Sequence, residues 1–112
     1  MTTAPDAQPG ADPAAIDEFL HTPARLSICS LLAPAEWVTF SFLRDTIGTS
    51  DSALSKQVAA LEQAGYVEVR KERAVAALRR QTSVRLTAVG REAFEAYLAT
   101  LERLVARARG SL

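Results

Sequence analysis

Apolar residues recur every three or four positions over four segments in the first part of the chain, and this is the spacing of an amphipathic helix. Polar residues divide these segments. Thr22, Thr39 and Ser50 each stand just before one of them, where a side-chain oxygen can cap the first turn of a helix. The sequence therefore predicts helices over residues 14–20, 23–33, 40–47 and 51–64.

The last two of these helices are separated by a very short connection, Gly48-Thr49. The glycine is expected to end the first helix of the pair in a left-handed conformation. On that helix, Phe42, Leu43 and Ile47 recur at helical spacing. Two helices joined by a tight turn that contains glycine form a helix-turn-helix.

The pattern changes to alternation after residue 65. Residues 66–70 and 83–86 alternate apolar and polar side chains, as the two strands of a hairpin do, and residues 71–82 would form its tip. Thr87 can then cap a final helix of about twenty residues, which would be roughly 30 Å long.

The final helix carries an apolar seam at alternating three- and four-residue steps, the spacing found in coiled coils. Its own short sheet is too small to cover such a seam, so a second copy of the chain is the expected partner. The predicted dimer interface consists of Phe94, Tyr97, Leu98, Leu101, Leu104 and Val105.

Composition and charge narrow the class of protein. The chain has 112 residues, of which 48% are hydrophobic, and this is sufficient for one domain with its own core. The formal net charge is zero, yet the charges are unevenly distributed. Residues 1–55 hold two basic and seven acidic side chains, whereas residues 56–112 hold eleven basic and six acidic side chains. A dense basic segment that contains the single acid Glu72 can bind phosphates even on a neutral protein. Its basic residues are Arg70, Lys71, Arg73, Arg79, Arg80 and Arg85.

The chain has few side chains that could take part in catalysis or bind a metal ion. One cysteine, one histidine and scattered carboxylates form no nucleophile–base pair and no metal set, so we expect no enzyme activity, no metal and no cofactor. Residues 1–10 lack the features of a secretion signal and no apolar run is long enough to cross a membrane, which predicts a cytoplasmic protein with no membrane partner. Residues 1–13 are expected to form a disordered tail.

Four runs of sequence resemble those of winged helix-turn-helix regulators of the MarR and ArsR type, particularly the small single-domain group. They are H-T-P-A-R-L at 21–26, F-S-F-L-R-D at 40–45, L-S-K-Q-V followed by L-E-Q-A-G-Y-V within 54–67, and L-T-A-V-G-R at 86–91. The resemblance covers residues 16–106. It implies a mainly α fold with a small β-hairpin wing, a DNA-binding domain over 14–86 and a dimerisation helix over 87–112. Gln57 and the alanine-rich wing tip at 74–78 depart from the family pattern.

The resemblance implies a homodimeric transcriptional regulator, expected to be a repressor, that binds specific double-stranded DNA. The second helix of the pair would enter the major groove, where Lys56 suits guanine and Gln57 suits adenine. The alternative is a winged-helix module that contacts proteins rather than DNA. The expected DNA contacts are Ser50, Ser52, Ser55, Lys56 and Gln57 on the helix, and Arg70, Lys71, Arg73, Arg79 and Arg80 on the wing.

Three further residues have both a structural and a functional interpretation. Cys29 stands among apolar residues and is expected to be buried rather than to sense oxidants. His21 is expected to be structural or exposed rather than a ligand or pH switch. Trp37 is expected to belong to the core. If a small-molecule effector exists, it would bind at the dimer interface beside Trp37, Phe19 and Tyr97, because apolar clefts form between helices.

Overall fold

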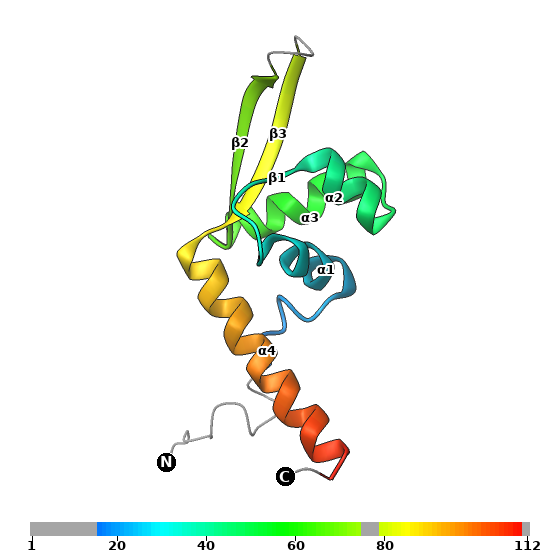
Figure 1. Cartoon of the computed structure of the whole chain (residues 1–112), viewed down its shortest axis with the longest axis vertical. Helices are drawn as coiled ribbons and strands as arrows, with labels where there is room; N and C mark the ends of the chain where they lie inside the picture. Colours follow the sequence, from blue (N-terminus) through cyan, green and yellow to red (C-terminus); the bar gives the residue numbers. More distant parts are fainter. Residues whose placement is uncertain (1–15, 75–78, 111–112) are drawn as a thin grey trace.

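The computed structural model describes residues 16–74 and 79–110, which form a mainly α-helical fold with a small antiparallel sheet. The expected tail, residues 1–13, and residues 75–78 of the hairpin tip lie outside the described residues. In Figure 1 the hairpin rises at one end of the molecule and the last helix runs toward the other. The elements are α1 (Pro23–Leu32), β1 (Val38–Thr39), α2 (Phe40–Ile47), α3 (Asp51–Gln63), β2 (Val67–Ala74), β3 (Arg79–Leu86) and α4 (Ala88–Ala108).

Each of these helices begins after the polar residue that the sequence predicts as its cap. The hydroxyl groups of Thr39, Ser50 and Thr87 each accept a hydrogen bond from the backbone N–H three residues further on, at 3.1, 3.1 and 2.9 Å. Thr22 does the same for α1 at 3.4 Å. These bonds satisfy N–H groups that have no partner inside the first turn of a helix.

The turn between α2 and α3 also has the predicted form. Gly48 has a φ of 77° and ends α2, and the carbonyl oxygen of Arg44 accepts the N–H groups of both Gly48 and Thr49. Of the three apolar residues that recur at helical spacing on α2, Phe42 is 52% exposed. The helix has only eight residues and buries Leu43, the next residue around its axis, so Phe42 is left on the flank.

The segment before α1 is not the predicted helix. Residues 18–20 form a turn, in which the backbone N–H of Leu20 donates to both the backbone and the side-chain oxygen of Asp17, at 3.1 and 3.2 Å. An aspartate side chain that bonds a nearby N–H favours a turn over a continuing helix. Leu20 is nevertheless fully buried, so the segment still contributes to the core.

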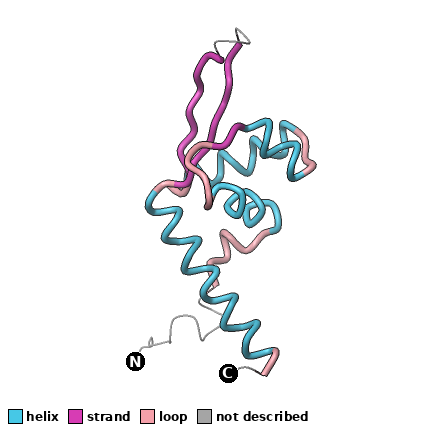
Figure 2. The backbone as a smooth tube through the Cα atoms, viewed as in Figure 1, coloured by secondary structure: helices cyan, strands magenta, loops and turns pink. Residues whose placement is uncertain are grey.

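The sheet is larger than the alternation of side chains predicts. Its strand order is β1-β3-β2, with Val38 opposite Val84 and Val67 opposite Leu86. β2 and β3 continue through residues that were expected to form the tip, and Figure 2 shows them projecting beyond the helices as a long ribbon. A ribbon in solvent is polar on both faces, so the apolar–polar alternation that marks a strand disappears there.

The core lies between α1, α2, α3, the base of the sheet and the first half of α4. Phe94 and Tyr97 on α4 are 3% and 2% exposed, so the expectation that a second copy covers them is wrong. They are covered because α4 packs beside α1 and the turn before it, as well as the sheet. Arg91 donates to the carbonyl oxygen of Ala33 at the end of α1, at 2.8 Å, and the phenol oxygen of Tyr97 lies 2.9 Å from Nδ1 of His21.

Candidate nucleic-acid interface

α3 has one buried face and one free face. Leu54, Val58 and Leu61 pack into the core, where they fix the rotation of the helix about its axis. The opposite face is exposed along its whole length. It consists of Ser52, Ser55, Lys56 and Ala59. These side chains are slender or flexible, and most can form hydrogen bonds, as the entry of a helix into a major groove requires.

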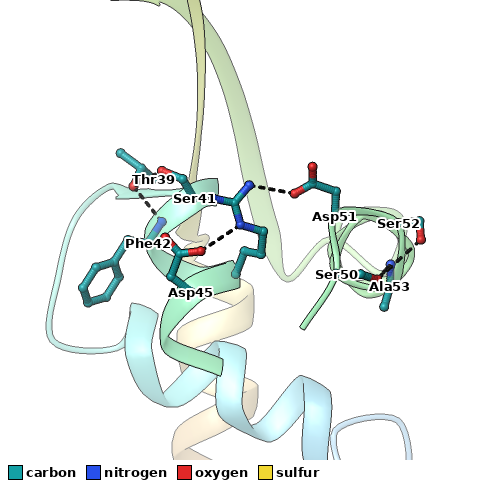
Figure 3. Close-up of polar contacts among 9 residues, drawn as sticks. Thr39, Ser41, Phe42, Asp45, Ser50, Asp51, Ser52 and Ala53 are labelled. Carbon is teal, nitrogen blue, oxygen red and sulfur yellow. Dashed lines mark hydrogen bonds and ion pairs between the residues drawn. The ribbon is translucent and has the colours of Figure 1, made fainter. Parts of the chain in front are cut away.

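The beginning of α3 is tied to α2 by ion pairs. The guanidinium group of Arg44 donates to the carboxylates of Asp45 and Asp51, both at 2.9 Å (Figure 3). These two hydrogen-bonded carboxylates raise the pKa of Arg44 above its usual value, the bond to Asp45 being the larger cause. The sequence analysis missed this pair, although an arginine that precedes a tight turn and an aspartate just after it are a usable signal. The bond between Arg44 and Asp51 joins the two helices across the turn.

Ser50 and Gln57 are less available to DNA than expected. The hydroxyl group of Ser50 caps α3 by accepting from Ala53. Gln57 is half-buried on the side of α3 that faces α1, where its Oε1 accepts a hydrogen bond from Nε of Arg25 at 2.9 Å. Gln57 lies in sequence beside Lys56, but one residue turns a helix by about 100 degrees, which carries it to the edge of the exposed face, beside α1.

An open groove of about 400 Å³ separates α3 from the wing, the ribbon formed by β2 and β3. Ser55 and Ala59 line it from the helix, and Lys71 and Thr82 line it from the two strands. Lys71 and Thr82 are opposite each other in the register of the sheet. The exposed face of α3 and one face of the wing therefore border the same concave surface.

The wing face that borders this groove is basic. Side chains on a strand alternate between its two faces, so Arg73 and Arg80, which are also opposite each other in the register, lie on the same face as Lys71 and Thr82. We call these four residues the inner wing face. Lys71, Arg73 and Arg80 are exposed. Arg79 pairs with Ala74 on β2, and its side chain lies outside the described part of the structure.

Arg70 lies on the opposite face of the wing, with Glu68, Glu72 and Arg85, and we call these four the outer wing face. Arg70 pairs with Glu72 at 2.7 Å and Arg85 pairs with Glu68 at 2.8 Å. The expectation that Arg70 acts together with Lys71 and Arg73 is therefore wrong. Its position follows from the alternation along β2, in which neighbouring residues point to opposite faces.

Trp37 packs against the outer wing face rather than inside the core. Its ring is half-buried between two guanidinium groups, with Cζ of Arg70 4.0 Å and Cζ of Arg85 4.7 Å from the ring centroid. Arginines stack readily on an indole in this way. These contacts attach the base of the wing to Trp37, the residue just before β1.

The expected effector cleft is not assembled from its three aromatic residues. Trp37 contacts the wing, whereas the ring of Phe19 meets the edge of Tyr66, with centroids 5.7 Å apart. Tyr97 packs against Phe94 inside the core. These contacts place the three rings against different parts of the fold.

Cys29 is buried, as predicted, and burial raises the pKa of its thiol to about 11, with the carboxylate of Asp17 as a second cause. His21 is exposed and contacts Tyr97. Within residues 16–74 and 79–110 no three histidine, cysteine, aspartate or glutamate side chains gather in a way that holds a metal ion. No helix in the same ranges has the length and apolar character needed to cross a membrane.

The second half of α4 presents the remainder of the apolar seam. Leu98, Leu101 and Leu104 are half-buried, and Val105 is 48% exposed. This part of α4 extends beyond the other helices (Figure 1). Six residues were predicted to form the dimer interface. Of these, only Leu98, Leu101, Leu104 and Val105 leave apolar surface that a second copy could cover.

Known proteins share this architecture. Residues 24–105 match a family described as Winged helix DNA-binding domain. An uncharacterised protein of Methanocaldococcus jannaschii is 30% identical over 81 residues, which make up 72% of this chain and 86% of that protein. The structure of a transcriptional regulator homologue from Pyrococcus horikoshii OT3 has a TM-score of 0.72 and 27% identity, and covers 80% of this chain and 86% of its own. NadR in complex with 4-hydroxyphenylacetate has a TM-score of 0.62 and 26% identity, and the match covers 79% of this chain and 64% of NadR.

Proposed function

This chain belongs to the winged helix DNA-binding domain family, and on that premise we propose that it is a homodimeric repressor that recognises a specific double-stranded DNA sequence. The family and the relatives make it a DNA-binding transcriptional regulator. The proposal adds sequence selectivity, two-fold assembly and repression. It assigns DNA binding to residues 14–86 and dimerisation to 87–112, and it requires no catalysis and no cofactor.

The observation that carries the proposal is the common surface of α3 and the inner wing face. With the exposed side of α3 in the major groove, Ser52, Ser55 and Lys56 would meet base edges and sugar–phosphate oxygens. Lys71, Arg73 and Arg80 would then follow the neighbouring backbone or a narrow minor groove. Base contacts would supply selectivity, and the wing would set register and salt dependence.

Two-fold assembly is supported by the exposed end of the seam on α4. Two copies joined there would present two α3 helices to DNA, and half-sites one helical turn apart, about 34 Å, would make the bound sequence nearly palindromic. Repression follows if such a dimer occupies a promoter.

A small-molecule effector also belongs to the proposal. It is supported by NadR, whose structure holds 4-hydroxyphenylacetate, although this chain spans only 64% of the length of NadR.

The test is a titration of the purified protein with genomic DNA fragments, including its own upstream region, at two salt concentrations, together with its mass in solution. We expect a dimer that binds one fragment selectively, with an affinity that falls as salt rises. Lys56→Ala should weaken selective binding about tenfold or more. The control Arg109→Ala removes the same charge from the exposed end of α4. Equal losses in both variants, or no selective fragment, would contradict the proposal and favour a protein-binding module.

A further inference from the structure

The side-chain amide of Gln57 is held by a bond whose chemistry fixes its orientation. Nε of Arg25 lies 2.9 Å from Oε1 of Gln57. A guanidinium group carries only donors, so the amide atom that faces it must be the oxygen. The NH₂ group of Gln57 is therefore turned away from Arg25.

Arg25 is itself held in place by the turn before α1. Its Nη1 donates to the carbonyl oxygen of Phe19 at 2.9 Å, and its Cζ lies 4.2 Å from the centroid of the Phe19 ring. Phe19 is braced in turn by Tyr66, whose hydroxyl group donates to Asp17 at 3.1 Å. The guanidinium group cannot rotate away from Gln57 without breaking these contacts.

The NH₂ group of Gln57 remains available. No acceptor for it is present among the described residues, and the side chain is only half-buried. A cavity of about 90 Å³ beside it is lined by Ala24, Thr49 and Ala53, among others. Ala24 and Ala53 lie near the beginnings of α1 and α3, and their small side chains leave room beside Gln57.

Resting on the DNA-binding function proposed above, we propose that Gln57 is a specificity-determining residue that donates to a base acceptor in the major groove, and that Arg25 is its positioning residue. Arg25 holds the amide oxygen, so recognition rests on the outward NH₂ group, which needs an acceptor. Guanine offers two acceptors, O6 and N7, thymine offers O4 and adenine offers N7. Cytosine offers only its amino donor and is excluded at this position.

The decisive variant is Gln57→Glu. One carboxylate oxygen keeps the bond with Arg25, and the other replaces the outward NH₂ group, so a donor becomes an acceptor. Base preferences are measured by selecting bound sequences from a randomised duplex library. We expect one position in each half-site, from which the wild-type chain excludes cytosine, to accept cytosine about tenfold better. The control is Gln63→Glu, on an exposed side chain of the same helix with the same change of charge, and it should leave every preference unchanged.

Arg25→Met supplies the second test, because it leaves the amide free to turn over. In this variant cytosine should become acceptable at the same position, because the amide oxygen can then face the cytosine amino group, whereas preferences elsewhere stay as they are. Thermal unfolding monitored by circular dichroism confirms that the variant is folded.

Two outcomes overturn this inference alone: selection of cytosine by the wild-type chain at the position sensitive to Gln57, or unchanged preferences in Gln57→Glu. A wild-type chain that selects no sequence overturns the proposed function as well, so the two failures are distinguished.

Discussion

The backbone of Gly90 lies directly against the carbonyl group of Tyr66, so that a Cβ atom on Gly90 would clash with the carbonyl oxygen. The same oxygen accepts the N–H of Thr87 at 3.0 Å, and the hydroxyl group of Thr87 donates to the carbonyl oxygen of Gly65 at 2.6 Å. The start of α4 is thus fixed to the turn that leads from α3 into the wing.

Gly90→Ala should therefore be strongly destabilising. The new methyl group meets backbone rather than a flexible side chain, so α4 must shift, and we expect a loss of about 3 kcal/mol or more in the free energy of unfolding measured with urea. Gly48→Ala is the comparison, because nothing lies near that position and only its left-handed backbone is strained. Its loss should be about 1 kcal/mol. Similar losses in the two variants would show that the contact with Tyr66 is not close.

The two faces of the wing should differ in their effect on DNA binding. Arg80→Ala on the inner wing face removes one phosphate contact, so the slope of log affinity against log salt should become shallower by about one. Arg70→Ala on the outer wing face removes the same charge and should leave that slope unchanged. The reverse result would mean that DNA approaches the outer wing face.

Val105→Glu should convert the dimer to a monomer, because it places a charge within the exposed apolar end of α4. Light scattering on a sizing column measures the change directly. Val89→Glu is the matched control, since Val89 is also exposed, at 58%, but lies on α4 away from that surface. A dimer that withstands Val105→Glu would place the interface elsewhere on the chain.

Cys29 should make the fold sensitive to alkaline pH. Its native pKa of about 11 lies above the ordinary value of 9.0, so the unfolded chain loses the thiol proton first. The cysteine's contribution is complete below pH 9 and is lost between pH 9 and 11, at a cost of about 2 to 3 kcal/mol. Denaturant unfolding from pH 8 to 11 measures this loss.

Cys29→Ala provides the reference for that experiment. It should be less stable at every pH because it leaves a small cavity, but its stability should fall less between pH 9 and 11. The pKa values of Tyr66 and Tyr97 are also raised, chiefly by burial, and both tyrosines remain in this variant. If the wild-type protein and Cys29→Ala lost the same stability between pH 9 and 11, the thiol would not be the group responsible for that loss.

Local features of the fold could be predicted from the sequence. Thr39, Ser50 and Thr87 were identified as caps because capping depends on a few consecutive residues, and Gly48 was identified because few other residues adopt its conformation. The face of α3 was predicted correctly for the same reason, since the spacing of Leu54, Val58 and Leu61 fixes it.

Features that depend on what lies opposite a residue could not be predicted. Helical spacing shows that Phe94 and Tyr97 share an apolar face, but it does not show whether their own chain or a second copy covers that face. The bond between Arg25 and Gln57 joins residues 32 positions apart, and no local pattern indicates it. The position of Arg70 could have been predicted, because the alternation of side chains along Val67 and Val69 places Arg70 on the outer wing face.

Trp37 is the only tryptophan of the chain, and it lies between two cationic side chains at the base of the wing. The light that an indole emits depends on the charges beside it, so any displacement of β2 or β3 changes the colour or yield of the emission. The protein therefore contains its own optical reporter, and unlabelled DNA is sufficient to follow movement of the wing in real time.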